Sequence, residues 1–156
     1  MKSLPKILLL IFLGLWISSA GLAQTRYSAP NGLNENSGLV KAQPISLSMA
    51  FSLSSPLSPG DTLILLDGVY GGNFKLELSG SREAPIIIMP LNEGKAIIDP
   101  SVNRIDGTGI TIRGSNVWII GIHVTSSSTE KRNDLGDNVE YEAGITVFGN
   151  DIKLIN

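Results

Sequence analysis

A 13-residue pattern that returns after 35 residues constrains the fold more than any other feature of this sequence. Residues 109–121 align on residues 144–156 without a gap, and five of the 13 positions are identical. Self-similarity at a period of about 20–50 residues is typical of solenoids, in which each repeat stacks on its neighbours. Each copy consists of two short apolar runs joined by a polar turn, so the sequence predicts an all-β solenoid, a parallel β-helix.

Stacking of these repeats predicts ladders of aliphatic side chains that fill the interior. The chain is 42% hydrophobic and 17% charged, a balance that argues against disorder. From residue 58 onward, short apolar runs are bounded by Gly, Pro, Asp or Asn, as strands are. An antiparallel sandwich remains the alternative fold, although convincing Asn-Gly hairpin turns are absent. The predicted ladders place Ile110 over Ile145, Ile112 over Val147, Val117 over Ile152 and Ile119 over Leu154.

Residues 1–23 are typical of a secretory signal peptide. Lys2 and Lys6 precede an apolar run from Ile7 to Ile17, and small residues follow it. We expect cleavage after Ala23, with Ala20 as the alternative site. An uncleaved N-terminal anchor is the competing interpretation, but the apolar run is short for a membrane span of about 20 residues.

Residues 24–57 form an N-terminal segment whose second half is ambiguous. Pro30-Asn31-Gly32 predicts a turn. From Pro44 to Leu57, apolar residues alternate as in a strand but also share one helical face. We favour a short amphipathic helix, because the first coil of a solenoid exposes a strand edge that a helix could cap. Residues 58–156 are then the first coils.

Composition excludes several kinds of site. The sequence has no Cys, which excludes disulfides, thiolate metal sites and a Cys nucleophile. A single His leaves no room for a His-rich metal site. The formal net charge of −2 implies no basic surface for nucleic acid. An exported chain without Cys indicates a bacterial periplasmic or secreted protein, with no membrane attachment after signal cleavage.

Three segments resemble the opening of secreted right-handed parallel β-helix proteins, the pectate-lyase-like group that includes chondroitinase B and alginate lyases. These segments are Pro59–Tyr70 (PGDTLILLDGVY), Ala84–Ile88 (APIII) and Ala96–Asp99 (AIID). The resemblance implies an N-terminal helix that caps the first coil and an acidic polysaccharide as partner. It also implies more coils than this chain contains, so we expect a fragment truncated at the C-terminus. A complete small β-helix that dimerises through its last edge is the alternative.

The resemblance implies a polysaccharide lyase acting by β-elimination, or else a non-catalytic adhesin or carbohydrate-binding scaffold. A lyase neutralises a uronate carboxylate with Ca²⁺ or Arg and removes a proton with a base. No catalytic residue can be assigned, because the resembling lyases carry theirs on more central coils. Cofactors and oligomeric state are left open, with Ca²⁺ as the candidate for the full-length protein.

Strand alternation places three candidate substrate-binding side chains on the outside of the coil. Trp118 could stack on a sugar ring, Arg113 could meet a uronate carboxylate, and His123 could serve as a polar contact. For each, an ordinary surface or loop-covered role is the competing interpretation. The loop after residue 124 has a weak likeness to a Ca²⁺ loop, but a solvated loop fits better and no metal ligands are assigned. Its acidic residues are Asp134, Asp137, Glu140 and Glu142.

Overall fold

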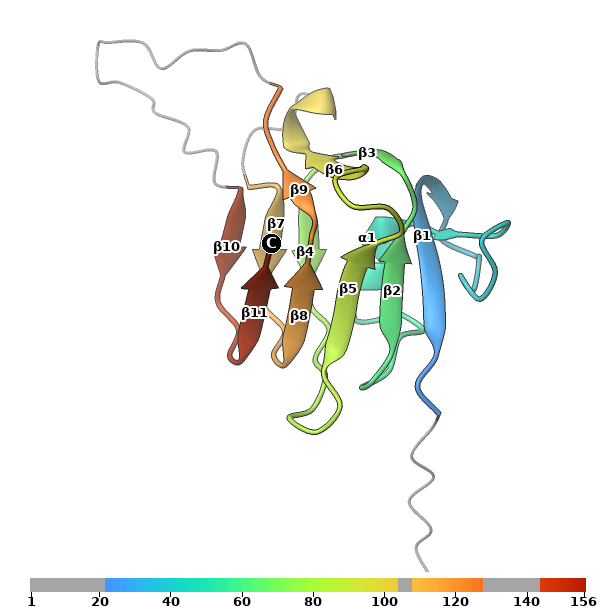
Figure 1. Ribbon diagram of the computed structural model, residues 1–156, viewed down its shortest axis with the longest axis vertical. Coiled ribbons are helices and arrows are strands. Elements are labelled where there is room, and N and C mark those ends of the chain that lie inside the picture. Colours follow the sequence, from blue (N-terminus) through green and yellow to red (C-terminus); the bar gives the residue numbers. More distant parts are fainter. Residues whose placement is uncertain (1–21, 104–107, 128–143) are drawn as a thin grey trace, which may run out of the picture.

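The computed structural model describes residues 22–103, 108–127 and 144–156 (Figure 1). Nearly all of the predicted signal peptide and the four acidic residues of the loop after residue 124 lie outside these ranges. Within them, the structure is built from short parallel strands, one five-residue helix and one 3-10 turn. No helix among the described residues has the length and apolar character needed to cross a bilayer.

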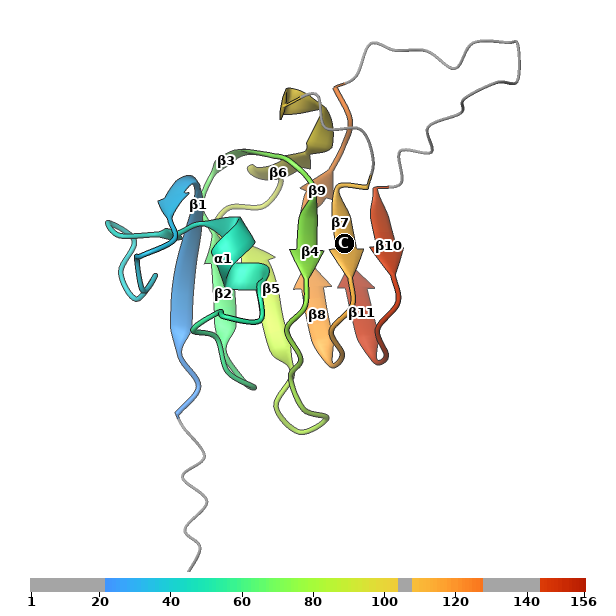
Figure 2. The same ribbon diagram turned by 180° about the vertical axis from the view of Figure 1, so that it is seen from behind.

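Eleven strands form three parallel sheets that lie around a common interior (Figures 1 and 2). From the second strand onward the chain visits the three sheets in turn, so consecutive strands belong to different sheets, as in a β-helix. Sheet A contains β1 (Thr25–Leu33), β2 (Thr62–Leu65), β5 (Ile86–Pro90), β8 (Val117–Ile120) and β11 (Ile152–Ile155). Sheet B contains β3 (Gly68–Gly71), β6 (Ala96–Asp99) and β9 (His123–Val124). Sheet C contains β4 (Phe74–Leu76), β7 (Ile110–Ile112) and β10 (Ile145–Val147).

The strand register confirms the stacking that the 35-residue repeat predicts. β10 pairs with β7 so that Ile145 lies beside Ile110, and β11 pairs with β8 so that Ile152 lies beside Val117. The turns that join these strands also repeat: Asn116 and Asp151, 35 residues apart, both adopt a positive φ near 54° and 53°. Asn and Asp tolerate this left-handed conformation better than most residues. Both strands and turns therefore follow one repeating unit.

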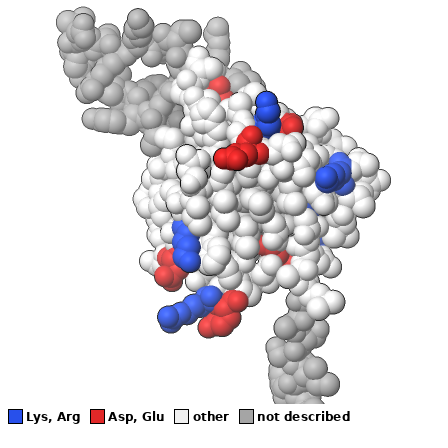
Figure 3. Space-filling view, viewed as in Figure 1, with Lys and Arg blue, Asp and Glu red and all other residues white. Residues whose placement is uncertain are grey.

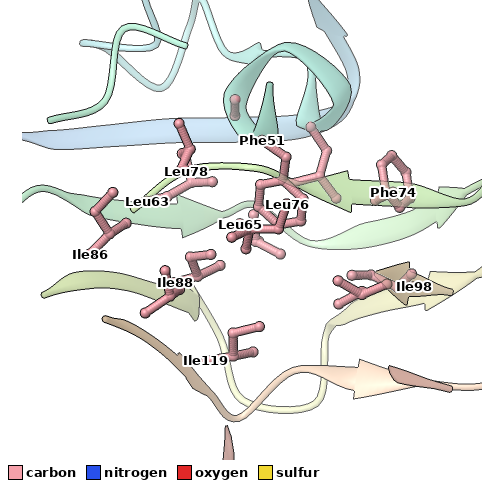
Figure 4. Close-up of a cluster of buried hydrophobic side chains, with 14 of the residues drawn as sticks. Phe51, Leu63, Leu65, Phe74, Leu76, Leu78, Ile86, Ile88, Ile98 and Ile119 are labelled. Atoms are coloured by element: carbon pink, nitrogen blue, oxygen red, sulfur yellow. The ribbon is translucent and has the colours of Figure 1, made fainter. Parts of the chain in front are cut away.

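The interior is a single cluster of aliphatic and aromatic side chains from all three sheets (Figure 4). Along β2, β5 and β8, buried residues alternate with partly exposed ones, because successive side chains point to opposite faces of a strand. Each coil is too thin to bury its own apolar face, so stacking provides the burial. The fully buried members include Leu63, Leu65, Ile88, Ile98, Ile110, Ile112 and Val117.

The ambiguous N-terminal segment contains a five-residue helix, α1 (Leu47–Phe51). The Ser46 hydroxyl accepts a hydrogen bond from the Met49 amide, which satisfies one free amide of the first turn. The helix packs against β1 and β4 (Figure 2), and the Phe51 carbonyl accepts a hydrogen bond of 2.8 Å from the Glu77 amide. This position beside the first strand of sheet C supports the capping role, which remains a prediction.

The turn predicted at Pro30-Asn31-Gly32 is wrong, because β1 continues through these residues to Leu33. Leu33 and Ser28 both form bridges to Ile45. A Cβ atom on Gly32 would lie 2.2 Å from the Ile45 carbonyl oxygen. Glycine is thus needed here because two backbone segments approach each other closely. The sequence alone does not distinguish such a glycine from one in a turn.

Candidate functional site

The three candidate residues lie on one coil but on three different sheets. Trp118 is in β8 of sheet A, Arg113 follows β7 of sheet C, and His123 is in β9 of sheet B. Arg113 and His123 are exposed and Trp118 is partly exposed. Because the sheets face different directions, the structure does not bring the three side chains together into one site.

Trp118 lies beside Ile87 of β5 and Lys153 of β11 in the register of sheet A. The Lys153 ammonium lies over the indole ring, 3.9 Å from its centroid. A cation in this position is attracted to the negative face of the ring, with an energy of about 0.5–1 kcal/mol at exposed sites. The indole therefore holds a lysine on the outer surface of sheet A.

Arg113 makes the corresponding contact on the sheet C side of the molecule. Its guanidinium carbon lies 5.1 Å from the centroid of the Phe148 ring, and that ring is 65% exposed. Lys75 of β4 is exposed on the same sheet and lies beside Thr111, which in turn lies beside Thr146. We call these five residues the sheet C face. Cations and hydroxyls in neighbouring strands can bind carboxylates and sugar hydroxyls.

His123 borders a hollow of about 510 Å³ beside the last strand of sheet B. Sheets A and C each continue by one more strand, β11 and β10, whereas β9 is the final strand of sheet B in the described part of the chain. The hollow borders β9 and the residues on either side of it. Its wall includes Glu93, Ile122, Val124, Ile145 and Asn156. Three of its lining residues, Ile122, Val124 and Ile145, also pack against the core.

Asp99, at the end of β6, is an almost fully buried carboxylate. Burial by itself raises the pKa of Asp99, but hydrogen bonds from Ser127 and Ser101 outweigh it and hold the pKa below its ordinary value. The Ser101 and Ser127 amides donate to Oδ1 at 2.9 and 3.2 Å, and the Ser101 and Ser126 hydroxyls lie 2.6 Å apart. Asp99 therefore ties together the segments that follow β6 and β9.

Tyr70 has a titratable side chain that is buried in the core. Burial raises the pKa of Tyr70 well above its ordinary value. Its hydroxyl lies 2.8 Å from the carbonyl oxygen of Leu66 and 2.9 Å from the carbonyl oxygen of Ser28. The hydroxyl thus joins two coils, and it serves the fold rather than chemistry at the surface.

No group of three or more His, Cys, Asp or Glu side chains is placed to hold a metal ion within the three described ranges. The Ca²⁺ expected from the family resemblance is therefore not assigned to any residues here.

Sequence reasoning missed Lys153, Phe148 and Lys75. The first two carry a usable signal, because each lies 35 residues after a candidate: Lys153 after Trp118, and Phe148 after Arg113. The two residues of each pair differ in type, so they do not form a ladder of identical side chains. Stacked coils nevertheless bring such residues into contact, and an aromatic ring beside a cation is a favourable pair.

The sequence is similar to those of pectate lyases, although no protein-family model matches it. Over 138 residues it is 26% identical to pectate lyase L of Dickeya dadantii (strain 3937) and 25% identical to pectate lyase L of Dickeya chrysanthemi. Each match covers 80% of this chain and 32% of the relative. The chain thus spans about a third of the length of these curated relatives.

Solved structures agree with this similarity. Pectate lyase Pel9A matches with a TM-score of 0.54 and 27% identity, over 65% of this chain and 28% of that one. A GH136 lacto-N-biosidase from Eubacterium ramulus matches with a TM-score of 0.59 over 85% of this chain and 26% of that one. Its 17% identity speaks for the fold alone. In sequence and in fold, the chain is therefore similar to the pectate-lyase-like parallel β-helix proteins.

Proposed function

We propose that this chain is part of an exported β-helix protein that binds or cleaves acidic polysaccharide, and that the full-length protein is a lyase acting by β-elimination. In this reaction a base removes the C5 proton of a uronate, the C4–oxygen bond breaks, and a C4–C5 double bond forms in the product. The 138-residue match to pectate lyase L carries the proposal, and the matching fold supports it. Export to the periplasm or medium rests on residues 1–23.

Within this chain, the sheet C face is the surface best suited to a carboxylated sugar chain. Arginine binds carboxylates through two parallel hydrogen bonds, and stacking on Phe148 limits the motion of the Arg113 side chain. Lys75 adds a second cation two strands away from Phe148, with threonine hydroxyls between. We assign carboxylate binding to Arg113 and Lys75, and we leave the catalytic base unassigned.

A non-catalytic adhesin or carbohydrate-binding scaffold is the second candidate. One observation favours it for this part of the protein: Trp118, Arg113 and His123 face outward from three separate sheets. Side chains so distributed can bind a polymer from several sides, whereas catalysis needs them to converge within hydrogen-bonding reach of one reacting centre.

The absorbance of the unsaturated product distinguishes the two candidates. The full-length protein and this chain are each incubated with polygalacturonate, alginate and chondroitin sulfate, with and without Ca²⁺. The lyase proposal expects absorbance to rise with at least one polymer for the full-length protein. Binding without any rise in absorbance would contradict the lyase proposal and favour the scaffold.

Charge-removing substitutions test the sheet C face. We expect Arg113→Gln and Lys75→Gln each to weaken binding of this chain to polygalacturonate by about threefold to tenfold, because each removes a cation that pairs with carboxylate. Lys95→Gln removes the same charge from an exposed position outside the sheet C face and is the matched control. Equal weakening by all three substitutions would mean that only overall charge matters, and would exclude a local site at this face.

A further inference from the structure

The outer face of sheet A carries a continuous group of apolar side chains. Its three central strands, β2, β5 and β8, read as nearly continuous apolar runs, which is typical of parallel sheets that are covered on both faces. The inner face lines the core, but no helix or strand among the described residues covers the outer one (Figure 1). We call this surface the sheet A face. Its partly exposed and exposed apolar and aromatic members are Tyr27, Ile64, Ile87, Met89, Trp118, Ile120 and Ile155.

These side chains form continuous rows across the strands. Ile87 lies beside Trp118, and the row continues to Lys153. In a second row, Tyr27 lies beside Ile64, which lies beside Met89. Figure 3 shows the same side of the molecule, where most of the charged side chains lie toward the margin and the surface is mainly uncharged. The face is therefore an apolar strip that runs perpendicular to the strands.

Both aromatic side chains of this strip hold a lysine. Lys153 lies over Trp118 at 3.9 Å, and Lys41 lies over Tyr27 at 5.6 Å, measured from each ammonium nitrogen to the ring centroid. The two pairs lie toward opposite ends of the strip, because β11 and β1 are the outermost strands of sheet A. A partner that fits the strip has apolar groups that can pack on its middle and negative charges that can pair with the two lysines.

The size of the strip favours a narrow partner over a folded domain. Five strands about 4.8 Å apart span about 19 Å, and four residues along a strand span about 13 Å, giving roughly 250 Å². A stable protein–protein interface needs about 800 Å² from each partner. A single polysaccharide strand is narrow, its pyranose rings have apolar faces that pack on aromatic and aliphatic groups, and its uronate carboxylates carry the negative charge.

We propose that the sheet A face is a second binding surface for acidic polysaccharide, separate from the sheet C face, with the sugar chain lying across the strands from Tyr27 to Trp118. The inference rests on the proposed polysaccharide function, since it assumes that class of ligand. The rings pack on the apolar rows, and the carboxylates pair with Lys41 and Lys153. Two surfaces on different sides of one β-helix allow the protein to hold the polymer at one while it engages a strand at the other.

Trp118 provides a direct measurement on this face. The sequence contains one other tryptophan, Trp16, so Trp16→Phe in the full chain leaves Trp118 as the sole source of indole fluorescence. Titration with polygalacturonate oligomers is expected to shift this emission in a saturable manner. Gel retardation in polygalacturonate measures total binding in parallel.

Matched threonine substitutions locate the binding. Ile87→Thr combined with Met89→Thr makes the strip polar in a single strand, and is expected to abolish the emission shift and to weaken oligomer binding by about fivefold. Val69→Thr is the control, because Val69 is 46% exposed on sheet B and undergoes the same kind of change. Thermal melting checks that the variants fold. If the double variant does not, the emission shift of the otherwise unsubstituted chain still decides the question.

Each outcome supports or overturns the proposal. A saturable shift that the double variant loses and the control keeps supports it. Retardation by polygalacturonate without an emission shift overturns it and leaves the proposed function standing, whereas absence of binding to any acidic polymer overturns both. A shift with phosphatidylglycerol vesicles but not with oligomers assigns the face to a lipid surface. Dimerisation that the double variant abolishes assigns it to a second copy of the chain. Both of these results contradict the proposal.

Discussion

At the scale of single residues, the side chains with the best-defined roles tie coils together. Asp99 accepts hydrogen bonds from the Ser101 and Ser127 amides, which belong to consecutive coils. Tyr70 reaches the carbonyls of Ser28 and Leu66 in a comparable way. Polar groups that are almost fully buried destabilise a fold unless they are paired, and both of these are.

Asp99 predicts a component of stability that depends on pH. Its pKa is lower in the folded protein than its ordinary value of 3.8, so its contribution is present above that value and is lost as pH falls through the folded pKa. We expect Asp99→Asn to lower the free energy of unfolding by about 1 kcal/mol at pH 7, because the amide accepts weaker hydrogen bonds than the carboxylate. Urea unfolding at a series of pH values measures the difference between the two proteins.

That difference is expected to shrink as the pH is lowered below 4, where the carboxylate of the unfolded chain becomes protonated. A difference that stayed constant down to the most acidic pH would show that the charge of Asp99 contributes nothing. If Asp99→Asn instead raised the free energy of unfolding at pH 7, the cost of burying the Asp99 carboxylate would exceed the contribution of its hydrogen bonds.

At the scale of elements, the turns between sheets C and A decide how closely coils can stack. A Cβ atom on Gly114 would lie 1.5 Å from the Leu78 carbonyl oxygen in the coil before it. A Cβ atom on Gly149 would lie 1.6 Å from the Gly114 carbonyl oxygen. The same position of the repeat thus needs glycine in consecutive coils, because backbone meets backbone there.

Gly114→Ala is therefore expected to lower the free energy of unfolding by about 3 kcal/mol or more, a loss typical of severe steric conflict in a core. Gly144→Ala is the matched control, because its Cβ would lie 3.7 Å from Cγ1 of Val124, an ordinary van der Waals contact. Chemical unfolding followed by circular dichroism compares the two. Similar losses from both substitutions would contradict the stacking distance described for these turns.

The cation–aromatic pair of Lys153 and Trp118 gives β8 and β11 a second kind of contact. A double-mutant cycle with Trp118→Leu and Lys153→Gln is expected to give a coupling energy of about 0.5–1 kcal/mol that favours the pair. The same cycle with Lys75→Gln, on sheet C, should give a coupling near zero. Equal coupling in the two cycles would mean that the Lys153 ammonium does not interact with the ring.

At the scale of the whole molecule, the repeat made the fold predictable because stacked coils place residues 35 apart side by side. Each ladder proposed from the sequence has its counterpart in the register of β7 with β10 or β8 with β11. The course of β1 could not be predicted, because its extension through Gly32 depends on contact with Ile45, which is distant along the chain. The bounds of α1 could not be predicted either, because they depend on packing against β4.

The candidate site was less predictable than the fold. Alternation along strands indicated that Trp118, Arg113 and His123 face outward, and they are at least partly exposed. It could not indicate that they lie on separate sheets, since this depends on where each turn redirects the chain. The 35-residue offset does place Lys153 beside Trp118 and Phe148 beside Arg113, but it does not indicate how each cation lies relative to the aromatic ring. Their role in binding substrate remains a prediction.

The two ends of the β-helix also differ in how well their outermost strands are protected from pairing with another chain. At the β1 end, Arg26 points inward beside Asp61, with 3.9 Å between Nε and Oδ2, and the Tyr27 amide donates to the Gly38 carbonyl. Inward charges and covering loops keep edge strands from pairing with other chains. At the β10 and β11 end, several apolar side chains are more than two-fifths exposed: Val147, Phe148, Leu154 and Ile155.

Binding of acidic polysaccharide is the central claim, and affinity electrophoresis tests it most directly. The full chain is run through native gels that contain increasing polygalacturonate, beside gels that contain dextran as a neutral polymer. The account predicts retardation that grows with polygalacturonate, saturates, weakens at higher salt as ion pairs are screened, and is absent in dextran. Unchanged mobility in polygalacturonate, alginate and chondroitin sulfate alike would contradict it.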